Sequence, residues 1–121
     1  MRLALKPRVQ EVILESKSDH SGEDVSHQDL SGSVWAEADL KGTDFSGSDM
    51  RGAVLSRAVM FKARLEGVDL SNAMLDYAVL RGVDMRNSLA VGATFVRSDM
   101  GEMLVEGTDF TDAIIDKYRC V

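Results

Sequence analysis

The chain offers few residues with the chemistry of an active site. Asp19, His20 and Ser21 are the residue types of a hydrolase triad, but adjacent residues do not reach triad geometry without a fold to place them. His20 and His27 are expected to be solvated, and with Cys120 as the single cysteine they do not make a zinc site. No P-loop and no dinucleotide-binding glycine motif is present. The sequence therefore predicts no catalytic residue, no metal and no cofactor, and a protein that is not an enzyme.

Size and charge narrow the classes of partner. The 121 residues suit one domain. Fourteen Lys and Arg against twenty Asp and Glu give a net charge of −6, and nucleic acid or anionic lipid would reward a basic surface. No apolar run approaches the ~18 residues that span a bilayer. We therefore expect neither direct nucleic-acid binding nor a membrane partner.

A period of five residues runs through most of the chain. Every fifth residue from Leu30 to Ile115 is apolar, at 18 consecutive positions, which we call centres. The residue two before each centre is Ala, Ser, Thr or Val in 16 of the 18 cases, and Gly or Asn stands two after it in 10. The centres that we expect in the core include Leu30, Leu40, Phe45, Met50, Leu55, Leu70, Leu75, Leu80, Phe95 and Phe110.

Neither regular element accommodates this period. On an α-helix, steps of five would separate successive centres by ~140° and spread them around the whole surface. On a β-strand, an odd step would alternate faces and expose half of the large apolar residues. A backbone that turns a corner every few residues returns each centre to an inner wall. The period therefore predicts a solenoid that is stabilised by stacking between neighbouring coils.

The repeated segments resemble those of a known family. Stretches such as AEADLKG, GSDMRGA, GVDLSNA and GTDFTDA are similar to the unit A(D/N)LXX of the pentapeptide-repeat proteins. The resemblance implies an all-β fold, a right-handed quadrilateral β-helix with four pentapeptides per coil and about 4.5 coils. It also implies that the centre and the small residue two before it point inward.

Residues 20 apart would then form columns, and the four outer sides differ. The residue just before each centre, the outer position, is mostly Asp on some sides, which we interpret as solvated, turn-stabilising carboxylates. An apolar stripe is either a contact surface or β-branched residues that favour extended backbone and shelter one another. The candidate stripe comprises Val34, Val54, Met74 and Ile114 on one side, Val59 and Val79 on the next, and Phe61.

The sequence divides into three segments. Residues 1–27 are expected to form a short N-terminal cap and a polar linker, with Val25 as the alternative start of a degenerate coil; residues 28–117 form the β-helix and residues 118–121 a tail. A cap is needed because a terminal coil exposes apolar interior and unpaired backbone. Cys120 lies on the centre register, as a buried thiol or the donor of an intermolecular disulfide.

Three functions are compatible with such a rod. The first is a non-catalytic scaffold that contacts another protein, or a second copy of itself, through an outer face. The second, implied by the resemblance, is an acidic rod that imitates DNA and binds gyrase or topoisomerase. The third is a cyanobacterial or thylakoid-lumen protein of unknown role. We expect the cytoplasm by default and the thylakoid lumen or another compartment if a targeting segment was removed.

Overall fold

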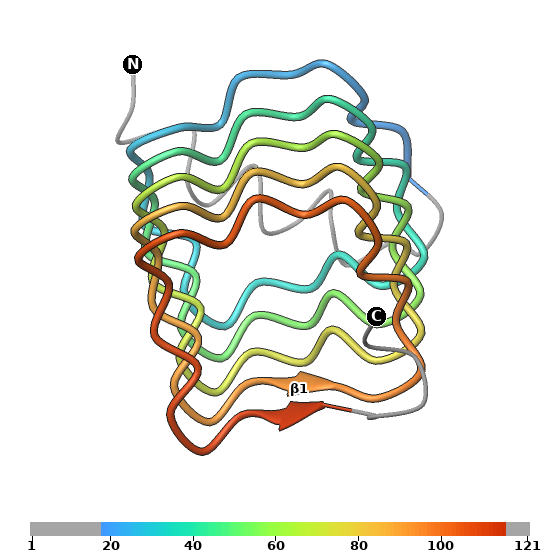
Figure 1. Ribbon diagram of the computed structural model, residues 1–121. Helices are drawn as coiled ribbons and strands as arrows, with labels where there is room; N and C mark the ends of the chain where they lie inside the picture. Colours follow the sequence, from blue (N-terminus) through green and yellow to red (C-terminus); the bar gives the residue numbers. More distant parts are fainter. Residues whose placement is uncertain (1–17, 116–121) are drawn as a thin grey trace.

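The computed structural model describes residues 18–115 as a stack of four-sided coils (Figure 1). Fifteen isolated parallel bridges join residues 20 positions apart, from Asp19 with Asp39 onward. Two short strands, β1 (Thr94–Phe95) and β2 (Ile114–Ile115), continue the same pairing in parallel register. The predicted quadrilateral β-helix is confirmed in its coil geometry.

The corners explain why each side is so short. Among residues 18–115, nineteen have positive φ, at every fifth position from Gly22 to Asp112, and nine of them are glycine. In most described pentapeptides, the carbonyl of the centre accepts a hydrogen bond from the N–H three residues later. Leu30, for example, accepts one from Ser33 at 3.1 Å. Positive φ at the third residue alone is the signature of a type II turn. A turn every five residues leaves about two extended residues per side.

Four of the five backbone N–H groups of a pentapeptide have a backbone acceptor. The N–H of Leu55 donates to Met74 O at 2.7 Å in the next coil, and that of Val54 donates to Ser33 O at 2.8 Å in the preceding coil. The N–H of the positive-φ residue also reaches the next coil, as from Gly52 to Ser71 O at 2.9 Å. The N–H of the small residue donates to the carbonyl of the preceding centre, as from Ala53 to Met50 O at 3.0 Å, and this bond closes the turn. One N–H, that of the residue just after the centre, has no backbone acceptor in this pattern.

Aspartate at the outer position supplies the missing acceptor. In every described pentapeptide with Asp there, its Oδ1 accepts the N–H of the residue two positions later, as in Asp29 with Ser31 at 3.2 Å and Asp69 with Ser71 at 3.0 Å. The predicted turn-stabilising role of these carboxylates is confirmed. The ten residues are Asp19, Asp24, Asp29, Asp39, Asp44, Asp49, Asp69, Asp84, Asp99 and Asp109.

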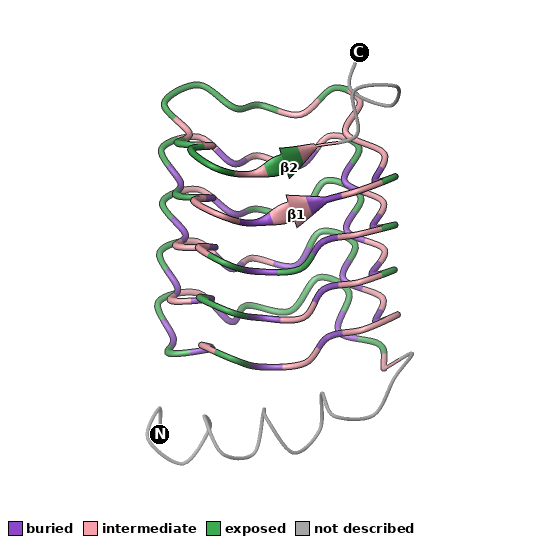
Figure 2. Cartoon of the chain, turned by 90° about the horizontal axis from the view of Figure 1, so that it is seen from below, coloured by how far each residue is buried: buried purple, intermediate pink, exposed green. Residues whose placement is uncertain are grey.

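The core consists of the inward pair of each pentapeptide. Centres and small residues from Val25 to Phe95 are buried in one continuous cluster. In Figure 2 the buried segments recur in successive coils, while the coil nearest the C-terminus is drawn as intermediate and exposed. Nine of the ten expected core centres are buried, from Leu30 to Phe95. Phe110 is only half-buried, because it belongs to the last coil that the structure describes.

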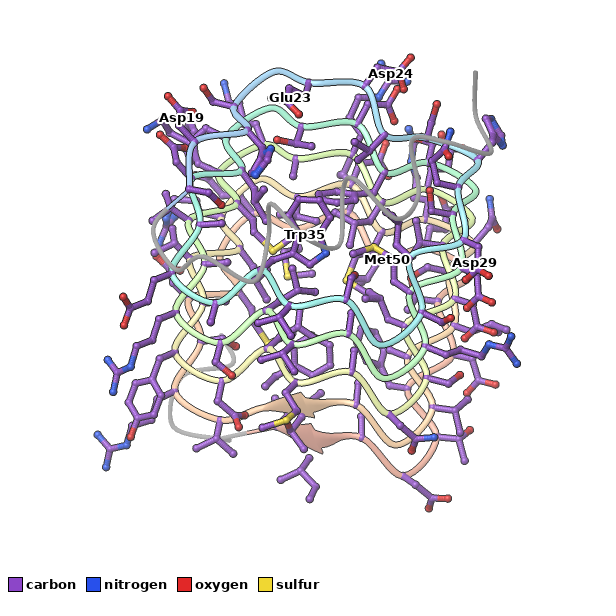
Figure 3. The ribbon with its side chains drawn as sticks, turned by 180° about the vertical axis from the view of Figure 1, so that it is seen from behind. Asp19, Glu23, Asp24, Asp29, Trp35 and Met50 are labelled. Carbon is purple, nitrogen blue, oxygen red and sulfur yellow. The ribbon has the colours of Figure 1, made fainter. Side chains whose placement is uncertain are left out.

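Residues 18–27 differ from what the sequence predicts. A polar linker is expected there, with a coil that begins at Val25 as the alternative. Asp19 and Asp24 bridge to the following coil and Val25 is buried, so the structure agrees with the alternative and extends the coil to still earlier residues. His20, expected to be solvated, occupies a centre position and is 8% exposed, with its ring 5.2 Å from that of Trp35. Figure 3 shows Trp35 and Met50 inside the coil, and Asp19 and Asp29 at its rim. His27 is exposed, as expected.

Three expectations concern residues outside the described range. They are the part of the N-terminal cap that falls in residues 1–17, the tail at residues 118–121, and the role of Cys120.

Replacing Gly52 by Ala should destabilise the fold by about 1 kcal/mol through backbone strain alone. Its φ is 70°, and a Cβ there would meet nothing within 4 Å. The reverse change, Glu37→Gly, removes a side chain from φ 61° and should leave stability unchanged or higher. Urea unfolding followed by circular dichroism measures both. A Gly52→Ala variant as stable as the wild type would contradict the corner assignment.

Leu89→Asn should raise stability by about 1 kcal/mol. Leu89 stands at an outer position between Asp69 and Asp109, and the N–H of Val91 has no acceptor among the described residues. Asparagine supplies the oxygen without adding a third negative charge to the column. Thermal unfolding of Leu89→Asn beside Leu89→Ala separates the new hydrogen bond from the loss of leucine. Equal midpoints for the two variants would refute the role given to the outer aspartates.

Candidate interaction surface

Register brings the predicted apolar stripe together. Parallel bridges join Val34 to Val54, Val54 to Met74 and, through Thr94, Met74 to Ile114. On the adjacent side a bridge joins Val59 to Val79. Since neighbouring strands lie about 4.8 Å apart, these outer side chains form continuous columns. The structure thus places the stripe residues in two columns on adjacent sides.

The stripe is widest on the two coils that contain residues 54–61 and 74–79. We define the apolar patch by Val54, Val59, Phe61, Met74, Tyr77 and Val79. The three valines are half-buried, whereas Phe61 is 37%, Met74 44% and Tyr77 48% exposed. Tyr77 is not among the predicted stripe residues, because it occupies a positive-φ corner between the two columns, where we expected Gly or Asn. The sequence did hold one signal for Tyr77, namely a large aromatic residue at a position where the repeat favours Gly or Asn.

Cations stack on both exposed aromatic rings of the patch. The Arg57 guanidinium lies 4.6 Å from the centroid of Tyr77, and the Lys62 ammonium lies 5.3 Å from that of Phe61. A cation over a ring face gains roughly 0.5–1 kcal/mol at an exposed site. Arg97 stands one coil beyond Tyr77 in the same corner column. The patch therefore has a basic border.

Among residues 18–115, four of the eight Lys and Arg side chains pair with aspartates. Lys41 contacts Asp39 at 3.0 Å, Arg51 contacts Asp49 at 2.6 Å, Arg81 contacts Asp99 at 3.2 Å and Arg86 contacts Asp84 at 2.7 Å. Within residues 18–115, no carboxylate lies within ion-pair distance of the other four cations. These four are Arg57, Lys62, Arg64 and Arg97.

Hydrogen bonds stabilise the ionised form of several outer aspartates. The hydrogen bonds from Arg86, chiefly from its side chain, hold the pKa of Asp84 below its ordinary value of 3.8, and Arg51 lowers that of Asp49 in the same way. For Asp109, the hydroxyl and N–H of Thr111 lower the pKa. These three carboxylates remain ionised at neutral pH, and each accepts the N–H of its own turn.

The triad residue types do not form a catalytic site. Ser21 Oγ donates to Asp19 Oδ1 at 2.9 Å, while His20 Nδ1 lies 3.1 Å from Glu23 Oε1, so histidine and serine face different partners. Within residues 18–115, no group of three or more His, Cys, Asp and Glu is placed to hold a metal ion. Over the same range, no helix has the length and apolarity to cross a membrane.

Comparison with known families agrees with this geometry. The family model for pentapeptide repeats matches residues 24–57, 53–89 and 63–101, with eight copies of the repeat. The chain belongs to the pentapeptide-repeat family. A comparison with curated proteins found no match. The match starts before residue 28, in agreement with the coil that the structure shows from residue 18.

Solved pentapeptide-repeat structures resemble the chain over most of its length. A pentapeptide-repeat protein from the Arabidopsis thaliana thylakoid lumen is 30% identical over 86% of this chain and 68% of that one, with a TM-score of 0.68. One from Nostoc PCC 7120 is 22% identical over 94% and 95% of the two chains, with a TM-score of 0.72. The second likeness shows the shared fold alone.

Acid should destabilise this pentapeptide-repeat rod partly through Asp84. Its pKa is lowered in the folded state, so the stabilisation is fully present above the unfolded value of about 3.8 and is lost as pH falls through the folded pKa. Asp84→Asn should therefore show a smaller fall in melting temperature than the wild type between about pH 5 and pH 3. Differential scanning calorimetry measures this, and parallel pH profiles would contradict the assigned ion pair.

Proposed function

We propose that this pentapeptide-repeat protein is a non-catalytic interaction module whose contact surface is the apolar patch. The observation that carries the proposal is the unequal distribution of apolar side chains around the rod. Phe61, Met74 and Tyr77 project beside the valines on two adjacent sides, whereas the outer positions of the other two sides are mostly aspartate. A contiguous exposed apolar patch usually marks a contact surface.

Rigidity supports the same proposal. The two coils that carry the patch are hydrogen-bonded to a coil on either side, for example from Val54 to Ser33 and from Leu75 to Thr94. A surface held in this way loses little conformational freedom on binding. The partner is another protein or a second copy of the chain.

The gyrase-binding alternative is less well supported. A DNA mimic would present its carboxylates as free charges along the rod. Here the ten outer aspartates accept turn hydrogen bonds, and Asp49, Asp84 and Asp99 also pair with arginines. The compartment stays a prediction, with the cytoplasm as the default and the thylakoid lumen as the alternative.

A lysine in the patch should abolish partner capture. Met74→Lys, alone or with Val54→Lys, would place an unpaired ammonium in the interface, and desolvating it should cost at least about tenfold in affinity. The assay is affinity capture from an extract of the source cells, with retained proteins identified by mass spectrometry.

Leu89→Lys is the matched control for this assay. Leu89 is 44% exposed, as Met74 is, but it lies on an aspartate side. We expect this variant to retain every protein that the wild type retains. If Met74→Lys and Leu89→Lys retain the same proteins, the patch is not the contact surface.

A further inference from the structure

The patch has unfilled backbone donors beside its apolar side chains. Where the outer position is Val or Met, the N–H two residues later loses its acceptor. Within residues 18–115, the N–H groups of Ser56, Phe61, Asp76 and Arg81 donate to no protein atom, and each follows a Val or Met of the patch by two residues. Four unfilled donors thus lie along the patch, two on each side.

A carboxylate from outside the pentapeptide can fill such a donor. The next N–H in the Ser56 and Asp76 column, that of Val96, follows Thr94 and has no outer aspartate of its own. It is satisfied at 2.8 Å by Oδ1 of Asp76, which belongs to the neighbouring coil. The column therefore accepts a carboxylate that approaches from the side.

The unpaired cations favour the same ligand group. Arg57 and Lys62 stack on Tyr77 and Phe61 and make no ion pair with a described residue, and Arg97 in the corner column makes none either. Charge-assisted hydrogen bonds to carboxylates are stronger than neutral ones. Patch, donors and cations together require a partner that is both apolar and acidic.

We propose that the apolar patch binds an acidic, apolar segment of another protein. The segment's apolar side chains lie on Met74 and the valines, and its Asp or Glu carboxylates accept from the free N–H groups and pair with Arg57, Lys62 and Arg97. The inference rests on the proposed function and names the chemistry of the partner.

Two other occupants fit less well. A second copy offers ten described aspartates that already bind their own turns, as Asp84 does to Arg86 and its backbone. Other carboxylates of that copy, such as Glu66 and Glu106, lie apart from its own apolar patch. Nucleic acid binds chiefly through its phosphates and lacks the apolar side chains that would cover the patch. An acidic segment of a different protein satisfies all three features of the surface.

The test uses a display library of random linear peptides selected on the full chain. We expect the selected peptides to combine Asp or Glu with aliphatic or aromatic residues. Their affinity, measured by fluorescence anisotropy, should weaken with added salt. It should fall at least about tenfold when the peptide's acids are changed to their amides, and by a similar factor in Arg57→Glu.

Val59→Asp is the decisive variant. It supplies the Phe61 N–H with an internal carboxylate, as ten other pentapeptides do, so the fold should be retained while the partner's carboxylate is excluded and repelled. Leu89→Asp makes the same change on an aspartate side and should leave the affinity unchanged. Circular dichroism and thermal unfolding confirm that both variants are folded.

The other outcomes are distinguishable. Peptides without an acidic bias that bind through Met74 but ignore Val59→Asp and Arg57→Glu would overturn this inference and leave the proposed function standing. Peptides indifferent to Met74→Lys, or no peptides at all, would count against both. A concentration-dependent dimer that Met74→Lys dissociates would assign the patch to a second copy, and tighter binding of a single-stranded oligonucleotide would assign it to nucleic acid. Both results would overturn the inference.

Discussion

Parallel hydrogen bonding between successive coils is the constraint from which the rest of this structure follows. Each pentapeptide sends N–H groups into the coils before and after it, for example from Val54 to Ser33 and from Leu55 to Met74. Those bonds form in register only if every coil contains the same number of residues. Four corners per coil then require a positive φ at every fifth residue, and the nineteen such residues meet that requirement whether or not they are glycine.

The same hydrogen bonds divide the pentapeptide into fixed and variable positions. The centre and the small residue are buried, and the corner is limited by its φ. The side chain at the outer position has one role in the backbone hydrogen bonding, which is to accept from the N–H two residues later. Aspartate does so at ten of the twenty described outer positions, and where Val or Met stands instead, the fold persists with an unfilled donor. The residue type at the outer position can therefore change without a change in architecture. The apolar patch lies where this position is Val or Met instead of Asp.

Much of this could be predicted from the sequence because the period is strict. The buried centres, the columns of Val34, Val54 and Met74, and the turn role of the aspartates all follow from positions counted in fives. His20 was missed because a polar residue at a centre position breaks the apolar pattern, although its ring packs edge-on against Trp35. Phe110 fits the pattern, yet burial there depends on what lies beyond the last described coil.

The chemistry of the patch was not predictable in the same way. Tyr77 occupies a corner, where the pattern favours Gly or Asn and says nothing of exposure. That Arg57 stacks on Tyr77 while Arg51 pairs with Asp49 depends on distances between side chains in three dimensions. The free N–H groups emerge only when every donor is assigned an acceptor.

The central claim, that residues 20 apart are stacked neighbours, can be measured directly as a distance. Spin labels at Ser31→Cys and Thr111→Cys, in a Cys120→Ser background, would lie on one outer column four coils apart. With about 4.8 Å between coils, double electron–electron resonance should show one narrow distribution near roughly 20 Å. A slip of one pentapeptide would move Met74 away from Val54 and break up the patch. A broad distribution, or a distance that requires the two labels to lie on different sides of the rod, would contradict the account.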